Sequence, residues 1–305
     1  MMRLSIQTGA CDREIGMKKT ASIIKEAGFE AVDWNFDIFT DIDRFKEPDY
    51  VSILEKPQAE INAFFDDDIK TIKEAGLDFA QSHSPFPAYL SRDESTLDRM
   101  IPVYEASLRL CAYAGCPATV IHGIAFKRDR GETKEHIDAM NEKLYTSLIP
   151  AAKETGVTVL LENLFFSRRG LRFNGHCADP RDAAAFIDHL NSIAGEECFG
   201  LCYDTGHGFL TKHDAYDYIT TLGSRIKALH IHDNGGLEDD HLAPYAGKFF
   251  WDEFIAALRD IRYAGDLNFE TFAQYSHGRV PERLIPAWFD YIRAVGEYFR
   301  NEIQK

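Results

Sequence analysis

Apolar residues follow two alternating spacings along this chain, one typical of β-strands and one typical of amphipathic helices. Short β-rich runs predict eight strands, at 4–8, 31–36, 79–83, 118–122, 157–163, 199–203, 226–231 and 267–270. Apolar residues at helical spacing predict eight helices, at 17–27, 58–75, 97–114, 134–155, 179–190, 215–222, 251–264 and 281–299. Glycine follows the predicted helices that end at 27, 75, 114, 155 and 264, as expected at a helix C-terminus.

The regular alternation of strands and helices predicts the fold class. A strand followed by a helix occurs eight times, and the chain shows no Ser/Pro-rich linker and no shift in composition. A length of 305 residues, 45% of them hydrophobic, suits one barrel of this kind. We therefore predict a single (β/α)₈ TIM barrel over residues 1–305, with an open, doubly wound sheet as the alternative.

The net charge and the cysteine content indicate which kinds of binding partner and which cellular compartment to expect. The formal net charge is −15, which argues against a general nucleic-acid surface or an acidic-membrane surface. No run approaches the ~18 consecutive apolar residues of a membrane span, and residues 1–6 lack the apolar core of a signal peptide. The six cysteines are scattered without a Cys-x-x-Cys pair, as expected for reduced thiols. These features predict a cytoplasmic protein.

The most informative stretch follows the predicted strand at 226–231. His230 and His232 are two residues apart, so on a strand they point to the same face. A glycine turn and the acidic segment Asp239-Asp240-His241 come next. Imidazole and carboxylate groups at this density are typical ligands of a divalent metal, although a solvated polar loop would have a similar composition.

Other predicted strands also end in ionisable residues. In a barrel, the carboxyl ends of all strands meet on one face, so these residues would share one pocket. Carboxylates buried there without partners would cost several kcal/mol each, and a metal removes that cost. The predicted set of metal or substrate groups is His83, His122, Glu162, Asp204, His207, His230, Asp239, His241 and Glu270. One six-coordinate ion cannot use all nine, so either several of them bind substrate or there are two or three ions.

The chain resembles the xylose-isomerase-like TIM-barrel superfamily over nearly its whole length. The resemblance rests on five motifs: Leu161-Glu162-Asn163, Asp204-Thr205-Gly206-His207, His230-Ile231-His232-Asp233-Asn234, Asp239-Asp240-His241 and Phe269-Glu270-Thr271. This superfamily holds sugar isomerases and epimerases, inositol-catabolic enzymes and endonuclease IV.

The resemblance to its ketose 3-epimerases implies a Glu, Asp, His, Glu quartet for one Mn²⁺, Co²⁺ or Mg²⁺, here Glu162, Asp204, His230 and Glu270. It also implies that Glu162 and Glu270 transfer the proton, through a cis-enediolate that the metal stabilises. One difference is clear: those epimerases carry a substrate-binding arginine shortly after the metal histidine, and this chain has Asn234-Gly235-Gly236 there.

Two other activities remain open. Endonuclease IV binds three Zn²⁺ with nine ligands, and this chain supplies all nine, including His83, His122 and the Asp239–His241 pair. The acidic charge and the lack of basic, intercalating loops argue against binding to duplex DNA. A lyase acting on oxidised sugars or glycosides is the other alternative, since it would use the same proton abstraction. The preferred prediction is a metal-dependent sugar, sugar-phosphate or polyol isomerase or epimerase.

Residues beyond the ligand quartet are expected to contact the substrate. Aromatic rings at strand ends could stack on a sugar face, and basic loops at 127–130 and 167–172 could bind a phosphate or carboxylate, or form a lid. The predicted substrate contacts are His83, His122, His207, His232, Trp34 and Arg168. Phe86 is a further aromatic candidate. Barrels of this kind often form dimers or tetramers, so a homo-oligomer is compatible with the prediction.

Overall fold

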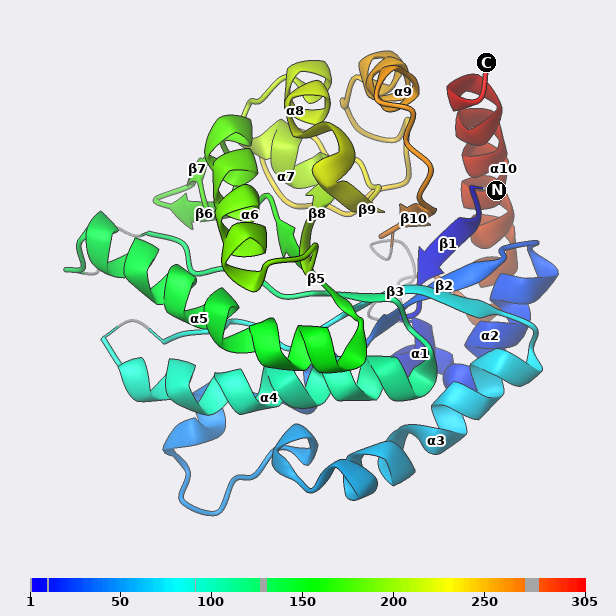
Figure 1. Ribbon diagram of the computed structural model, residues 1–305. Helices are drawn as coiled ribbons and strands as arrows, with labels where there is room; N and C mark the ends of the chain where they lie inside the picture. The colour runs from blue at the N-terminus through cyan, green and yellow to red at the C-terminus, as the bar shows by residue number, and fades with distance from the viewer. Residues whose placement is uncertain (1, 10, 91, 127–130, 272–279) are drawn as a thin grey trace.

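A computed structural model describes residues 2–9, 11–90, 92–126, 131–271 and 280–305 (Figure 1). Eight parallel strands form one sheet in the order β10-β1-β2-β3-β4-β5-β8-β9. The strands are β1 (Leu4–Gln7), β2 (Ala31–Asn35), β3 (Asp78–His83), β4 (Ala118–Val120), β5 (Thr158–Glu162), β8 (Phe199–Asp204), β9 (Ile226–His230) and β10 (Leu267–Phe269).

The two end strands of this sheet meet and close the barrel. The backbone amide of Ile231 donates to the carbonyl of Asn268 at 2.9 Å, and the amide of Glu270 donates to the carbonyl of Ile231 at 3.0 Å. Sheet order therefore follows chain order around a ring, which is the TIM-barrel arrangement. The predicted (β/α)₈ fold and all eight predicted strands are confirmed, and the open doubly wound alternative is wrong.

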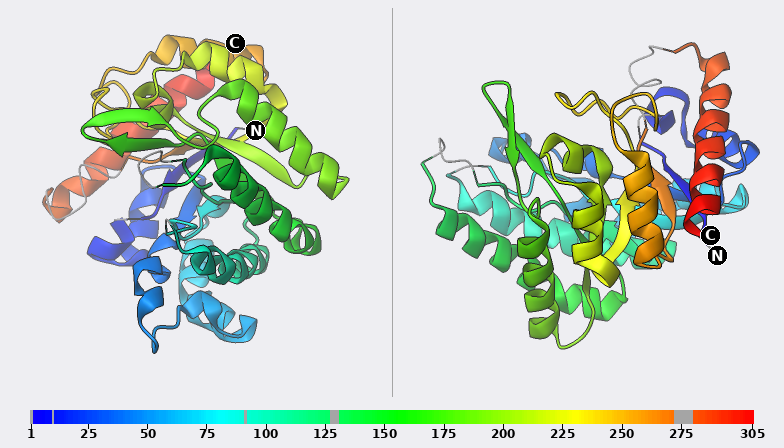
Figure 2. Two further views of the ribbon diagram at one scale, coloured as in Figure 1. Left: turned by 90° about the vertical axis from the view of Figure 1, so that its left-hand side faces the viewer. Right: turned by 90° about the horizontal axis from the view of Figure 1, so that it is seen from above.

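Helices surround the strands (Figure 2). They are α1 (Cys11–Ile15), α2 (Met17–Glu26), α3 (Gln58–Glu74), α4 (Glu94–Ala114), α5 (Lys134–Thr155), α6 (Pro180–Ala194), α7 (Thr205–Leu210), α8 (Ala215–Leu222), α9 (Trp251–Asp260) and α10 (Ile285–Ile303). Single 3₁₀ turns lie at η1 (Asp37–Phe39), η2 (Ile42–Lys46), η3 (Ile53–Glu55), η5 (Gly223–Arg225) and η7 (Glu282–Leu284). None of the helices in the described ranges is long and apolar enough to cross a bilayer.

Several helix ends differ from the sequence prediction by a few residues, and two of these differences have clear local reasons. Helix α9 ends at Asp260 rather than near residue 264, because Arg262 adopts a left-handed conformation with φ of 54°. Helix α10 begins at Ile285 rather than 281, because the residues after Pro281 form the 3₁₀ turn η7. All six cysteines are unpaired and buried, in line with the predicted reduced thiols.

The structure adds an antiparallel hairpin that the sequence pattern did not predict. Strands β6 (Phe165–Arg168) and β7 (Leu171–Asn174) pair through Arg169 and Gly170, which both have positive φ angles, 51° and 75°. That combination is the geometry of a type I′ hairpin turn. The hairpin and the segment after β9 project on the same side of the molecule (Figure 2, right).

Candidate metal centre and substrate cavity

A cavity of about 540 Å³ opens at the carboxyl ends of the barrel strands, where the last residues of β1, β2, β3 and β5 line it. A volume of this size holds a small-molecule ligand. Seven of the nine predicted ligands line it: His83, His122, Glu162, His207, Asp239, His241 and Glu270. The other two, Asp204 and His230, are fully buried below its floor.

The predicted quartet comes together around one nitrogen atom. Nδ1 of His230 lies 3.0 Å from Oε1 of Glu162, 3.4 Å from Oε2 of Glu270 and 3.9 Å from Oδ2 of Asp204. All four residues are buried, with 7% exposure or less. One imidazole nitrogen facing three carboxylates is a donor set for a divalent cation.

Asp204 is held in place by its neighbours in the sheet and by the helix that follows it. The side chain of Asn163 bonds both the backbone amide and the carbonyl of Asp204, at 2.7 and 2.8 Å. Oδ1 of Asp204 caps helix α7 by accepting the backbone amide of His207 at 2.6 Å. Its Oδ2 is thereby left facing the ligand cluster.

A further buried carboxylate, Asp33 on β2, lies next to His230. Oδ2 of Asp33 lies 3.2 Å from Nε2 of His230 and accepts hydrogen bonds from the side-chain amides of Gln81 and Asn268. A carboxylate beside Nε2 favours the tautomer with the proton there, which leaves the lone pair of Nδ1 for a metal. The sequence analysis did not identify Asp33, although an aspartate inside an apolar strand was a usable signal.

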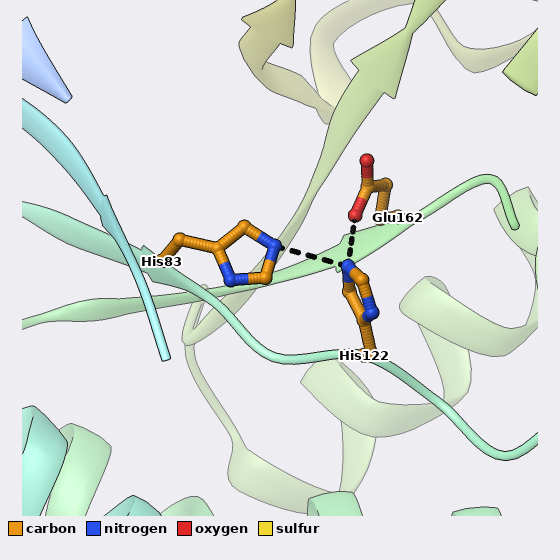
Figure 3. A group of neighbouring side chains, drawn as sticks. All are labelled: His83, His122 and Glu162. Atoms are coloured by element: carbon orange, nitrogen blue, oxygen red, sulfur yellow. Dashed lines mark hydrogen bonds and ion pairs between the residues drawn. The ribbon is translucent and has the colours of Figure 1, made fainter. Parts of the chain in front are cut away.

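His83, His122 and Glu162 form a group beside the quartet (Figure 3). Nε2 of His122 lies 3.0 Å from Nε2 of His83 and 2.5 Å from Oε2 of Glu162. Burial raises the pKa of Glu162, but the neighbouring His122 and His230 outweigh it and hold that pKa well below its usual range. Glu162 therefore links this histidine pair to the quartet.

His207, Asp239 and His241 gather on the other side of the cavity. Oδ2 of Asp239 lies 3.4 Å from Nε2 of His207 and 3.0 Å from Nε2 of His241. Burial lowers the pKa of His207, but Asp204 and Asp239 outweigh it and raise that pKa well above its ordinary value. All nine ligands predicted from the sequence therefore surround one continuous site.

The residues of this site fit a metal. Among the described residues, Nδ1 of His207 and Oδ1 of Asp239 are buried and make no hydrogen bond. The free Nδ1 of His207 points toward carboxylates, 3.5 Å from Oε1 of Glu162 and 3.7 Å from Oδ2 of Asp204. Buried polar atoms without partners are rare in folded proteins, and a bound cation would satisfy these.

His232 does not reach the cavity, so the prediction that it contacts substrate is wrong. It is fully buried, its Nε2 lies 2.9 Å from Oδ2 of Asp204, and its ring stacks on His241 at a centroid distance of 4.1 Å. His232 therefore contacts two candidate site residues, Asp204 and His241, but does not line the cavity. His232 instead holds the carboxylate of Asp204, a predicted metal ligand, in position.

Gly206 provides the space that His232 occupies. A Cβ atom on Gly206 would lie 2.0 Å from Cε1 of His232. We expect Gly206→Ala to lower the free energy of unfolding by about 1–3 kcal/mol and to weaken metal binding, because the imidazole must move away from Asp204. Urea denaturation and metal titration measure the two effects. Gly235→Ala is the control, since its Cβ would meet Asp240 only at 3.6 Å; equal behaviour of both variants would contradict the role of His232.

Trp34 is also not a substrate contact, and that prediction is wrong. Its side chain is 1% exposed and packs edge-on against Phe36 and Phe65, with centroid distances of 5.2 and 5.4 Å. Along β2 the side chains alternate, so Asp33 points into the barrel and Trp34 points outward to helix α3.

Neither of the two basic loops, at 127–130 and 167–172, gives direct evidence that it contacts the substrate. Arg168 ends β6 next to Ser167, which lines the cavity, but Arg168 itself does not line it, so its substrate role stays a prediction. Residues 127–130 lie outside the described ranges. Phe86 does line the cavity, as do Phe165 and Phe166 on the hairpin that the sequence analysis missed.

Comparisons with known proteins agree with this architecture. A protein of Sinorhizobium fredii, y4fM, is 26% identical over 280 residues, covering 84% of this chain and 81% of that protein. A probable endonuclease 4 of Methanoculleus marisnigri is 23% identical over 184 residues, covering 54% of this chain and 59% of that protein. A solved L-ribulose 3-epimerase aligns with a TM-score of 0.72 at 20% identity, over 100% of this chain and 96% of that one. Residues 21–294 match the family described as xylose isomerase-like TIM barrel, and the chain belongs to that family.

Proposed function

We propose that this protein is a divalent-metal-dependent isomerase or epimerase of a sugar or a sugar-derived polyol. The observation that carries the proposal is the position of two buried carboxylates. Glu162 and Glu270 come from β5 and the end of β10, both line the cavity, and both face Nδ1 of His230 at 3.0 and 3.4 Å. A substrate in the cavity would therefore lie against two carboxylates and next to a metal ligand.

The chemistry follows from these residues. Glu162, Asp204, His230 and Glu270 would hold the ion, which supplies Lewis-acid polarisation of a carbonyl and its neighbouring hydroxyl. One glutamate then removes the proton from the carbon between those groups, and the other delivers a proton to the opposite face or to the adjacent carbon. Gln7 positions Glu270 by donating from Nε2 to its Oε1 at 3.0 Å.

The two glutamates have different electrostatic surroundings. Burial raises the pKa of Glu270 above its usual value, against the opposing effect of His230 and His241. Its partner Glu162 lies between two histidines that favour its ionised form. The likeness in fold to an L-ribulose 3-epimerase supports proton transfer on a sugar as the use of this pair.

A zinc phosphodiesterase of the endonuclease IV type is the second candidate. The specific observation in its favour is that two further groups adjoin the quartet and could hold ions: His83 and His122 with Glu162, and His232 and His241 with Glu270. The partial likeness to a probable endonuclease 4 points the same way. The net charge of −15 disfavours duplex DNA as its substrate.

Product analysis tests the proposal against this rival and against a lyase. Metal-loaded protein is incubated separately with a panel of aldoses and ketoses, with glycosides and with abasic duplex DNA. The proposal predicts new isomers or epimers from at least one sugar. Release of an aglycone or water would indicate the lyase, and incision of the DNA without any sugar conversion would contradict the proposal in favour of the phosphodiesterase.

Metal removal should lower stability as well as activity. Buried carboxylates around His230 repel one another without a cation, so we expect a chelator to lower Tm by roughly 5–10 °C and added metal to restore it. Elemental analysis of protein purified without chelator gives the ion count. About one Mn²⁺, Co²⁺ or Mg²⁺ per chain agrees with the quartet alone, whereas three Zn²⁺ per chain would favour the phosphodiesterase. An unchanged Tm after complete chelation would contradict a metal centre here.

A further inference from the structure

One side of the cavity is apolar and does not contribute to the predicted metal centre. We define this apolar wall as Phe86, Ile124, Leu164, Phe165 and Phe166, all of which line the cavity. They follow strands β3, β4 and β5, which are neighbours in the sheet. The five residues of the wall therefore come from neighbouring strands on one side of the barrel.

The apolar wall starts at the candidate ligands. The ring of Phe86 lies 4.7 Å from the ring of His122, and the ring of Phe165 lies 5.0 Å from the ring of His207. Phe86 is 44% exposed, so the wall also reaches the solvent. Phe166 is held by stacking on Phe173 of the paired strand, with centroids 5.3 Å apart. An apolar group on this wall would sit close to the reacting carbons.

The part of the cavity at β1 and β2, next to β3 in the sheet, has a different character. Polar and charged groups line it: Gln7 and Asn35, which end β1 and β2, and Arg13 and Asp37, which follow these strands. Hydroxyl groups of a sugar find partners there, but on the apolar wall they would lose their hydrogen bonds to water without replacement. An unsubstituted sugar, with a hydroxyl on nearly every carbon, therefore matches only half of the cavity.

We propose that the substrate is an oxidised glycoside, with the sugar and its ring ketone at the ligand cluster and an aromatic or alkyl aglycone on the apolar wall. The glycosidic bond blocks the anomeric carbon, so the carbonyl that proton transfer requires lies on another ring carbon. The inference rests on the proposed function for the sugar half of the substrate. Contact with Phe86 and Phe166 removes apolar surface of the aglycone from water, which favours binding in proportion to the area buried. The site discriminates in this way between a glycoside and a free sugar of the same configuration.

Calorimetric titration of the metal-loaded protein tests this with three matched probes: D-glucose, methyl D-glucoside and phenyl D-glucoside, in both anomeric forms. We expect a phenyl glucoside to bind ~10–100-fold more tightly than the methyl glucoside. The Phe86→Ala and Phe166→Ala variants should each lose most of the difference in affinity between the phenyl and methyl glucosides. Leu171→Ala is the matched control, because Leu171 is on the same hairpin but 61% exposed and outside the cavity.

Each outcome decides for or against the inference. Equal affinities for all probes, including no detectable binding of any, would overturn it, as would a phenyl gain that persists in both Phe variants. Failure of the proposed function looks different. Phenyl-dependent binding without isomerisation of any sugar or oxidised glycoside would support the inferred substrate class and contradict the proposed reaction. Turnover of free ketoses without tighter binding of the phenyl glucoside would support the proposed reaction and contradict the inferred substrate class.

Discussion

Replacing Glu162 with glutamine should reduce turnover of the best sugar substrate by at least ~1000-fold, measured at saturating metal. General acid–base catalysis contributes ~10²–10⁴-fold, and a glutamine amide cannot accept the substrate proton. The side-chain oxygen of glutamine can still ligate, so saturating metal separates loss of proton transfer from loss of the ion. Glu162 is also the residue that joins the His83–His122 group to the quartet, so no other carboxylate among the described residues occupies an equivalent place.

The matched control for this variant is Glu154→Gln. Glu154 lies in the last turn of α5, where its side chain is 60% exposed and pairs with Arg109. That substitution should leave turnover unchanged. Circular dichroism of both variants shows whether the barrel still forms. Wild-type turnover in a folded, metal-loaded Glu162→Gln protein would rule out the proposed role of this residue.

Asp33→Asn should weaken metal binding ~10–100-fold, as is typical when the partner of a metal-binding histidine is removed. Asparagine keeps the shape of the side chain, but its neutral amide oxygen favours a proton on Nε2 of His230 less strongly than a carboxylate does. Because Asp33 does not line the cavity, the loss should appear in metal affinity first and disappear when metal is saturating. Direct titration with Co²⁺ or Mn²⁺ measures the affinity without relying on turnover.

Asp78→Asn provides the comparison for Asp33→Asn. Asp78 starts β3 at the other end of the barrel, is 74% exposed and pairs with Arg3. It should have wild-type metal affinity. Unchanged metal affinity in Asp33→Asn as well would show that the carboxylate behind His230 does not set its tautomer.

The sequence predicted the strands correctly and placed the candidate site residues at one end of the barrel, because both inferences depend on the periodicity of strands and helices. Strand ends of a parallel barrel meet on one face, so His83, Glu162 and Glu270 could be placed together before their contacts were known. The face of a strand residue was harder to assign. In β2 both sides are buried, so alternation of apolar and polar residues does not reveal that Asp33 points inward and Trp34 outward.

The β6–β7 hairpin was missed for a different reason. Its strands are short and only partly buried, and the apolar run of β5 masks its beginning. The turn signal was Arg169-Gly170, which is weaker than the Asn-Gly or Asp-Gly pairs that mark type I′ turns. This omission affected the function as well as the fold, because the hairpin supplies Phe165 and Phe166 to the apolar wall.

Deuterium incorporation is the most direct test of the central claim that Glu162 and Glu270 transfer a proton on a sugar carbon. Metal-loaded protein is incubated in D₂O with the sugar and glycoside panel, and the products are followed by NMR. The account predicts deuterium at the carbon next to the carbonyl, dependent on metal and lost in Glu162→Gln. Conversion of a sugar with full retention of its original hydrogen, or exchange that persists in Glu162→Gln, would contradict it.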